Sequence, residues 1–346
     1  MNLRLIPIDL VTRHPFGISR GTTSSKPSLI VELEQGGVRG YGEAAEYAFF
    51  GALRADTMAT LEALRPLIAD WQLTDPGQFW TAMRDAISRV TGEADSGRVT
   101  FPLSALDTAA HDLWGKLKGR PVWELWGLST RSIPPSNYTI GIDSIGMMQQ
   151  KLSEQSGFPV YKIKLGTVRD LEIVRALRDQ TSAPFRIDAN AGWGELETQR
   201  NAELLHALGV ELIEQPLARS DWAGMARLHP NAPIPFIADE SCGVESDVAR
   251  CPGHFHGINI KLEKCGGLTP ARRMITEARS LGLRVMIGCF TQSTVGISAA
   301  AQLLPLVDYA DLDGALLLAN DVAQGVRIES GRVLFPDMPG CGILWD

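Results

Sequence analysis

The sequence lacks the features that mark secreted, membrane-spanning and nucleic-acid-binding proteins. It has only five cysteines in 346 residues and no CxxC pair, so we expect reduced thiols rather than a disulfide framework. No apolar run approaches the roughly 18 residues of a membrane-spanning helix, and residues 1–17 are too interrupted for a signal peptide. The net charge of −7, without a long run of Lys or Arg, argues against nucleic acid or a membrane surface as the partner. We therefore expect a cytoplasmic protein that binds a small molecule.

Two common ligand-binding patterns are also missing. There is no evident Gly-rich phosphate loop. The segment CPGHFH at residues 251–256 has a Pro, a Gly and a lone Cys that are more typical of a loop entering a strand than of a zinc site. What the sequence does contain is 45% hydrophobic residues, enough for a sizeable core. Its length suits one large domain plus a smaller one, and it is compatible with a homo-oligomer.

The first third of the chain predicts a small α+β domain. Residues 1–46 alternate apolar and polar positions, and Gly36–Gly37 lies between two such runs, as a hairpin turn requires. Between the first two strands, residues 14–28 are rich in turn formers, and we expect them to form a loop that contains Arg20. Helical periodicity then replaces the alternation. We predict an α+β capping domain over residues 1–130.

The next part of the chain repeats a short apolar run followed by a helical segment. The eight runs are YTIG, VYKIKLG, FRIDAN, ELIEQP, PFIADE, GINIKLEK, RVMIGC and YADLDG. Polar residues end seven of them, at intervals of 24, 26, 25, 22, 28 and 22 residues: Lys164, Asp188, Glu214, Asp239, Lys261, Cys289 and Asp311. This spacing accommodates a strand, a turn, a helix and a turn, and eight such strands close into a barrel with reactive groups at their C-terminal ends. We predict an α/β fold, a (β/α)7β TIM-like barrel over residues 131–320, with a doubly wound open sheet as the alternative.

The last residues, 321–346, depart from this repeat. They include VRIESGRVLF, which predicts a pair of strands. We expect this C-terminal segment to pack back against the capping domain and complete it.

Three acids, Asp188, Glu214 and Asp239, end consecutive predicted strands. In a closed barrel their side chains converge at the mouth. Three like charges without a cation would be costly, and an all-oxygen set of ligands that leaves room for substrate oxygens favours Mg²⁺ over zinc. One or two such acids would be explained by capping of the next helix. Three in a row, between strands that end in lysine, are better explained by a magnesium site.

Two lysines flank the three acids. Lys164 ends the preceding strand and Lys261 the following one, so they face each other across the expected metal. One amine can remove a proton from the α-carbon of a metal-bound carboxylate, and the other can return it on the opposite side, with the metal stabilising an enediolate. Lys162 shares a strand face with Lys164, and a neighbouring cation favours the neutral, basic form of a lysine amine. The alternative for this strand is a solvated edge with two surface lysines.

The segments YKIKLG, RIDANAGW, LIEQP, ADES and NIKLEKCGG resemble the barrel signatures of the enolase superfamily, muconate-lactonizing subgroup, and the resemblance covers essentially the whole chain. It implies the following roles: Lys164 and Lys261 as the acid/base pair, Lys162 as its electrostatic companion, and Asp188, Glu214 and Asp239 as Mg²⁺ ligands. The subgroup catalyses several reactions, so the particular reaction has to be inferred from other residues.

A further pair of acids indicates the reaction. Asp311 and Asp313 lie on one face of the eighth strand, towards the mouth, where two carboxylates would hold the α-ammonium group of a substrate. Helix capping after the strand is the alternative for this pair. The Asp-x-Asp pattern resembles the marker of dipeptide epimerases, a group that includes the L-Ala-D/L-Glu epimerases. The resemblance implies an isomerase that inverts the C-terminal residue of an L-Ala-X type dipeptide by two-base 1,1-proton transfer, and it implies a place in murein peptide recycling.

Residues around the mouth give conflicting indications of the substrate side chain. In the Ala-Glu epimerases an arginine in the first cap loop meets the side-chain carboxylate, and ISRG, with Arg20, resembles that segment. Aromatic residues of the second cap loop indicate an apolar side chain instead: Tyr47, Phe49 and Phe50. Gln292 stands where many relatives carry Glu, so the exact specificity stays open. Two further residues that end strands are expected to line the pocket, Thr139 and Cys289.

Three other functions stay open from the sequence. o-Succinylbenzoate synthase and muconate cycloisomerase belong to the same superfamily, but their substrates have no ammonium group for Asp311 and Asp313 to hold. From a different class, Lys164 or Lys261 would form a Schiff base in an aldolase-type barrel. A non-catalytic binding protein is the third, although it would have no use for both lysines and all three acids.

Overall fold

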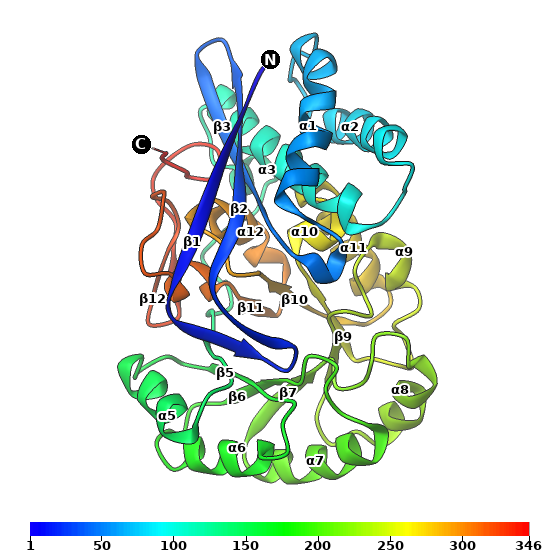
Figure 1. The fold of residues 1–346 in the computed structure, drawn as a ribbon, viewed down its shortest axis with the longest axis vertical. Helices are drawn as coiled ribbons and strands as arrows, with labels where there is room; N and C mark the ends of the chain where they lie inside the picture. The colour runs from blue at the N-terminus through cyan, green and yellow to red at the C-terminus, as the bar shows by residue number, and fades with distance from the viewer. Residues whose placement is uncertain (346) are drawn as a thin grey trace.

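Eight parallel strands form the centre of the computed structural model, which describes residues 1–345 (Figure 1). They lie side by side in chain order: β4 (Tyr138–Ile140), β5 (Tyr161–Lys164), β6 (Phe185–Asp188), β7 (Val210–Glu214), β8 (Phe236–Ala238), β9 (Gly257–Ile260), β10 (Arg284–Gly288) and β11 (Tyr309–Asp311). A parallel bridge from Ser136 to Ala310 joins the approach to β4 to β11, so the sheet closes on itself. The predicted barrel is confirmed, and the doubly wound alternative is wrong because the strand order never reverses.

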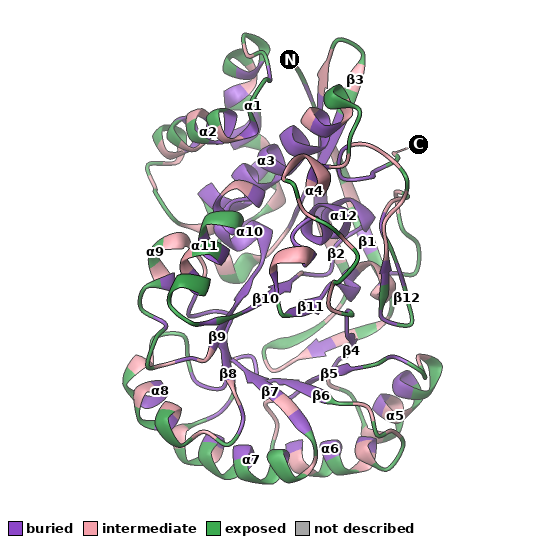
Figure 2. Cartoon of the chain, turned by 180° about the vertical axis from the view of Figure 1, so that it is seen from behind, coloured by how far each residue is buried: buried purple, intermediate pink, exposed green. Residues whose placement is uncertain are grey.

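Helices follow the strands and cover the outside of the barrel, with buried strands inside and exposed outer helix faces (Figure 2). They are α5 (Ile145–Glu154), α6 (Asp170–Arg178), α7 (Glu195–Ala207), α8 (Trp222–Leu228), α9 (Glu245–Val248), α10 (Leu262–Cys265), α11 (Leu268–Ser280) and α12 (Thr294–Ala301), with the 3-10 turns η2 (His229–Asn231), η3 (Leu304–Leu306) and η4 (Asp313–Leu317). The amphipathic helix α6 illustrates the packing, because it buries Ile173, Val174 and Leu177 and exposes Glu172 and Arg175. Within residues 1–345, no helix combines the length and the hydropathy needed to cross a membrane.

A second unit caps the barrel. Its antiparallel sheet comprises β1 (Asn2–Ile18), β2 (Gly21–Gln35) and β3 (Val38–Ala45). Gly36 and Gly37 have φ angles of 60° and 81°, as the predicted hairpin turn requires. The helices that follow are η1 (Ala48–Phe50), α1 (Arg54–Ala69), α2 (Pro76–Thr91), α3 (Gly97–Lys118) and α4 (Val122–Leu125). Helix α3 packs closely on β3, because Gly40 and Gly42 face its backbone where a Cβ atom would collide.

The first hairpin is longer than the sequence predicts. Residues 14–28, expected to form a loop, instead continue β1 and β2, which stay paired as far as Ile18 and Gly21. Only Ser19–Arg20 forms the turn. A register shift between Val11 and Phe16 of β1 accommodates the turn-forming residues that precede it. The tip therefore reaches the mouth of the barrel (Figure 1), where the Ser19 hydroxyl donates a hydrogen bond to the Asn190 carbonyl (3.1 Å).

The C-terminal segment returns to the capping unit. Strands β12 (Arg327–Glu329) and β13 (Arg332–Leu334) form the predicted pair. This pair lies against the barrel, since the Ser136 amide donates a hydrogen bond to the Gly331 carbonyl (2.9 Å). The residues after it contact α3: the Cys341 amide donates to Asp112 (2.8 Å), and the Lys116 ammonium donates to the Ile343 carbonyl (2.9 Å). The end of the segment thus contacts the capping domain, whereas its strand pair packs on the barrel.

Candidate active site

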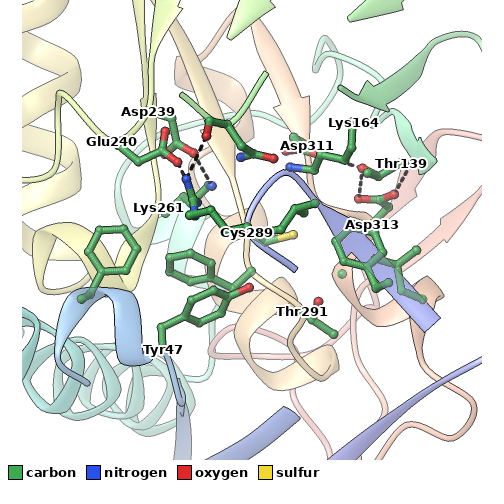
Figure 3. A pocket seen from close by; sticks show the side chains of 18 residues that line it. Tyr47, Thr139, Lys164, Asp239, Glu240, Lys261, Cys289, Thr291, Asp311 and Asp313 are labelled. Atoms are coloured by element: carbon green, nitrogen blue, oxygen red, sulfur yellow. Dashed lines mark hydrogen bonds and ion pairs between the residues drawn. The ribbon is translucent and has the colours of Figure 1, made fainter. Parts of the chain in front are cut away.

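A cavity lies at the mouth of the barrel, between the C-terminal ends of the strands and the cap (Figure 3). Eight of the predicted site residues line it: Arg20, Thr139, Lys164, Asp239, Lys261, Cys289, Asp311 and Asp313. The other three, Lys162, Asp188 and Glu214, are buried beside it, with the Lys162 ammonium 3.2 Å from Asp188 and 2.7 Å from Glu214. The fold therefore brings together all the residues that the sequence predicts for the site.

Three acids converge next to the cavity. Strand pairing places Lys164 beside Asp188 and Asp188 beside Glu214, and Asp239 follows the end of β8. One carboxylate oxygen of each acid lies within 4.8 Å of the others, and all three side chains are buried. Burial and the charge of Asp188 raise the pKa of Glu214, whose Oε2 atom contacts the Lys162 ammonium at 2.7 Å. A buried cluster of carboxylate oxygens is the kind of ligand set that fits a hard divalent cation.

Two lysines contact different acids of this cluster. The Lys164 ammonium lies 2.6 Å from Oδ2 of Asp188, and the Lys261 ammonium lies 2.7 Å from Oδ2 of Asp239. Figure 3 shows the two lysines on either side of the cavity. Burial disfavours the charged form of Lys261, but the combined attraction of Asp239 and Glu214 outweighs it and raises the pKa of Lys261.

The third lysine, Lys162, lies among carboxylates. Its ammonium is 2.6 Å from Asp311, in addition to its contacts with Glu214 and Asp188. Burial disfavours its charge, but these acids together raise the pKa of Lys162 well above its usual value. The sequence predicts Lys162 as a companion of Lys164, whereas the structure shows that acids are its dominant neighbours. The reason is barrel closure, which brings Asp311 of β11 towards β5.

Asp311 ends β11 and Asp313 begins the 3-10 turn η4, so the two acids do not share a strand, although the sequence predicts that they do. Both nevertheless line the cavity, and each already has partners. Asp311 accepts hydrogen bonds from Lys162 and from Nδ2 of Asn137 (2.7 Å). Asp313 accepts hydrogen bonds from the backbone amide and from the hydroxyl (3.1 Å) of Thr139. Burial and the charge of Asp311 raise the pKa of Asp313 to about 7. A cationic ligand group placed here would meet both carboxylates and favour the ionised form of Asp313.

Arg20, at the tip of the first hairpin, lies at the rim of the cavity. Its guanidinium is 2.8 Å from Oε1 of Glu240 and donates a hydrogen bond to the Asn190 carbonyl (3.0 Å). It also lies 4.5 Å from the centre of the Phe49 ring. Arg20 therefore connects the cap to the loops after β6 and β8, and its charge already faces a buried carboxylate.

An aromatic wall lies on the cap side of the cavity. Tyr47 and Phe50 line the cavity, and the Tyr47 ring packs 4.1 Å from the ring of Phe290. Phe49, which the sequence grouped with them, is half-exposed and lies outside the cavity lining. Gln292 does not line the cavity either, because its side chain points to the buried Glu263 and donates a hydrogen bond to it.

Two charged residues of the site were not singled out from the sequence. Lys264 is buried, and its ammonium contacts Oδ1 (2.5 Å) and the backbone carbonyl (2.7 Å) of Asp239. Glu240 is buried next to Asp239, and neither of its carboxylate oxygens accepts a hydrogen bond of good geometry. The sequence gives one indication that they belong to the site, because Glu240 lies within the ADES segment and Lys264 within the NIKLEKCGG segment. Their contacts depend on three-dimensional packing that these segments do not reveal.

Side chains of the segment CPGHFH contact nearby backbone carbonyls. The Cys251 thiol donates to the Asp247 carbonyl (3.5 Å), and the His254 ring contacts the Pro252 carbonyl (3.1 Å). In the described part of the chain, the acid cluster is the one group of three or more ligand side chains with suitable spacing for a metal.

The fold and the site together define a class of enzyme, a capped barrel in which three strand-end acids lie between two strand-end lysines. Comparison with known families agrees with this class. Residues 4–127 match the mandelate racemase / muconate lactonizing enzyme N-terminal domain, and residues 147–346 match the enolase C-terminal domain-like model. The chain belongs to the mandelate racemase / muconate lactonizing enzyme family of the enolase superfamily.

Several of its relatives are epimerases. An L-Ala-D/L-amino acid epimerase of Flavobacterium johnsoniae is 47% identical over 99% of both chains. A solved dipeptide epimerase of Enterococcus faecalis, complexed with Mg and L-Leu-L-Tyr, is 29% identical with a TM-score of 0.89, covering 99% of this chain and 98% of its own. A dipeptide epimerase of Methylococcus capsulatus, complexed with Mg and L-Arg-D-Lys, is 30% identical with a TM-score of 0.88 over 99% of both chains. The chain is thus an isomerase of the racemase and epimerase type.

Proposed function

We propose that this protein is a Mg²⁺-dependent dipeptide epimerase that inverts the α-carbon of the C-terminal residue of an L-Ala-X dipeptide. The observation that carries the proposal is the placement of Lys164 and Lys261 on either side of one cavity, each against a different acid of the cluster, with Asp311 and Asp313 lining the same cavity. Opposed amines suit a reaction that removes a proton from one face of a carbon and returns it to the other.

Asp188, Glu214 and Asp239 would hold the metal ion. Their oxygen ligands and burial fit Mg²⁺, and relatives have been solved with Mg and a dipeptide bound. When bound, the ion would supply stabilisation of the negative charge that develops on the substrate carboxylate as the α-proton leaves. Lys264 would orient Asp239, the third of these ligands, because its ammonium contacts Oδ1 of Asp239 at 2.5 Å.

The two lysines carry the proton transfer. Lys164 and Lys261 are each nearly buried and lie within 2.7 Å of a cluster acid, so both ammonium groups are fixed in place. One of them, in its neutral form, takes the α-proton, and the opposite one, in its charged form, donates a proton to the other face. The direction of reaction decides which lysine serves as base and which as acid.

Asp311 and Asp313 select a substrate with an amino group. They present two carboxylates to the cavity, and an α-ammonium group would pair with both. The substrates of o-succinylbenzoate synthase and muconate cycloisomerase have no such group. A Schiff-base aldolase has no need of the acid cluster that each lysine contacts. These features favour an epimerase over the other functions open from the sequence.

We infer that X is an uncharged, apolar residue. Tyr47, Phe50 and Phe290 provide an apolar wall for its side chain. Arg20 already faces Glu240 at 2.8 Å, so an acidic side chain would have to compete with that carboxylate. Arg20 suggests an acidic side chain and the aromatic residues suggest an apolar one, and we give the aromatic residues the greater weight.

The test is a dipeptide library incubated in D₂O with Mg²⁺ and analysed by mass spectrometry for α-deuterium. We expect exchange with L-Ala-L-Phe and L-Ala-L-Leu, and slower exchange with L-Ala-L-Glu. If no dipeptide in a broad library exchanges its α-proton, the proposed function is wrong. Preferred exchange with L-Ala-L-Glu would contradict only the inferred side chain.

A further inference from the structure

We propose that two buried carboxyl groups outside the acid cluster, Glu263 and Asp170, are positioning residues, each of which holds the turn that carries one of the two lysines. Glu263 would act through Lys261 and Asp170 through Lys164. Each would therefore govern proton transfer at one face of the substrate only. The inference rests on the two-lysine reaction proposed above.

Glu263 lies two residues after Lys261, in the one-turn helix α10, and is 1% exposed. Its carboxyl accepts a hydrogen bond from the side-chain amide of Gln292, in the loop after β10. The backbone amide of Ala45, at the end of β3, also lies at this carboxyl and favours its charged form. Two distant segments therefore hold the turn that presents Lys261. Because catalysis depends on the placement of the reacting groups, a small shift of this turn would slow proton transfer by Lys261.

The same contact links the lysine turn to the cap. Ala45 precedes the cavity-lining Tyr47 by two residues. Two residues before Ala45, the buried Glu43 accepts a hydrogen bond from the hydroxyl of Ser293 (2.6 Å), at the start of α12. Two acids thus anchor the end of β3 to the barrel, and Glu263 is the one that belongs to the lysine turn.

Asp170 lies six residues after Lys164, at the start of α6. It is 3% exposed and accepts hydrogen bonds from the backbone amides of Gly166 (2.9 Å) and Thr167 (2.8 Å), which form the turn after β5. It also accepts one from the indole of Trp193 (2.7 Å), in the loop after β6. All these partners belong to the barrel. The Lys164 turn is therefore held within the barrel, whereas the Lys261 turn is held jointly by the barrel and the cap.

A purely structural role predicts a different result from a positioning role. Loss of a buried hydrogen-bonding side chain destabilises the fold and lowers the amount of active protein, which slows exchange of both epimers by the same factor. Misplacement of one lysine slows only the epimer whose α-proton faces that lysine. The other epimer can still lose its α-proton to the intact lysine, and regain a deuteron from the same side. Exchange rates measured separately for the two epimers therefore distinguish the roles.

The experiment measures initial rates of α-deuterium incorporation into L-Ala-L-Phe and L-Ala-D-Phe in D₂O with Mg²⁺ by proton NMR. Lys164→Ala and Lys261→Ala first assign one epimer to each lysine. We expect Glu263→Ala to slow the Lys261 epimer by about tenfold or more and the other by less than about threefold. We expect Asp170→Ala to give the reverse asymmetry.

Asp107→Ala is the matched control. Asp107 is fully buried and accepts hydrogen bonds from the amide and the hydroxyl of Thr269 (both 2.8 Å), so it also joins the cap to the barrel, but it does not line the cavity. Its replacement is expected to slow both epimers by one common factor. Melting temperatures of all variants show how much of each effect is lost stability. If Glu263→Ala does not fold, Gln292→Leu can be used instead, because it removes the partner of Glu263. We expect this variant also to slow the Lys261 epimer more than the other epimer, but by a smaller factor than Glu263→Ala.

Equal slowing of both epimers by the Glu263 and Gln292 variants, or stronger slowing of the Lys164 epimer, would overturn the inference. The proposed function would still stand in that case, provided that the wild-type protein exchanges both epimers and the two lysine variants separate them. A wild-type protein that exchanges neither epimer would overturn the proposed function and this inference together.

Discussion

The ammonium of Lys162, on β5, lies 2.6 Å from the carboxylate of Asp311, on β11. The two residues are 149 positions apart in the sequence, and barrel closure brings them together. Lys162 also lies 2.7 Å from Glu214, so one lysine contacts both an acid of the cluster and an acid of the proposed ammonium site. Changes at Asp311 are therefore expected to affect both sites.

We predict that Asp311→Asn is more damaging than Asp313→Asn. The first change removes a charged partner of the buried Lys162 as well as a ligand for the substrate amine. The second removes a ligand whose other partner, Thr139, is uncharged and can still donate to the amide oxygen of an asparagine. Because breaking a buried ion pair is costly, we expect Asp311→Asn to lower kcat/KM by about 10²-fold or more, through both kcat and KM. Asp313→Asn should mainly raise KM. Steady-state epimerisation of L-Ala-L-Phe, followed by polarimetry, measures this, and unchanged kinetics in both variants would argue against an ammonium site here.

The affinity for the dipeptide should depend on pH through Asp313. Burial and the charge of Asp311 raise its pKa to about 7, so the group becomes neutral as the pH falls below that value. A neutral Asp313 attracts an ammonium group less strongly, and KM is therefore expected to rise on the acidic side of pH 7. The profile of KM against pH measures this, with Asp313→Asn as the control that should flatten it. A KM of the wild-type protein that is constant through pH 7 would contradict the prediction.

Mg²⁺ should stabilise the folded protein through the acid cluster. A ligand that binds only the native state at 100 times its dissociation constant adds about 2.7 kcal/mol to the free energy of unfolding. We expect Mg²⁺ to raise the melting temperature of the wild-type protein and of Asp313→Asn, and EDTA to reverse the effect. Asp188→Asn should lose most of the increase. Equal stabilisation of all three proteins by Mg²⁺ would place the ion elsewhere.

The stability of the fold should fall as the pH rises towards 8 because of Glu263. Burial, followed by the charge of Glu43, raises the pKa of Glu263 to about 8. An acid with a raised pKa in the folded state contributes stability that is present below its unfolded pKa and is lost as the pH rises through the folded value. Glu263→Gln has no such titration, so its melting temperature should rise relative to that of the wild type between pH 6 and pH 9. Thermal melts at both pH values measure this, and a constant difference would contradict it.

The barrel and the residues at its mouth could be predicted from the sequence because both depend on local signals. A spacing of about 25 residues between strand ends specifies repeated βα units, and parallel strands carry their terminal residues to one edge. This suffices to bring Asp188, Glu214 and Asp239 together and to place Lys164 and Lys261 on either side. The family resemblance then adds the reaction type.

The remaining features depend on packing between segments that are distant in the sequence. Residues 14–28, around the hairpin tip at Arg20, are rich in turn formers and therefore predict a loop. They form paired strands in the structure, where the tip docks on the barrel. The contacts of Lys264 with Asp239, and of Lys162 with Asp311, depend on side-chain reach across neighbouring strands. A strand pattern specifies which face a side chain occupies, and it does not specify which partner that side chain meets.

The central claim is that Lys164 and Lys261 act on opposite faces of one substrate carbon. Its most direct test is solvent deuterium exchange and inversion, followed together for L-Ala-L-Phe and L-Ala-D-Phe with the wild-type protein, Lys164→Ala and Lys261→Ala. The account predicts that the wild-type protein exchanges and inverts both epimers, and that each variant loses inversion but still exchanges one epimer, a different one in each case. If both variants exchange the same epimer, the two lysines act on one face and the account is contradicted.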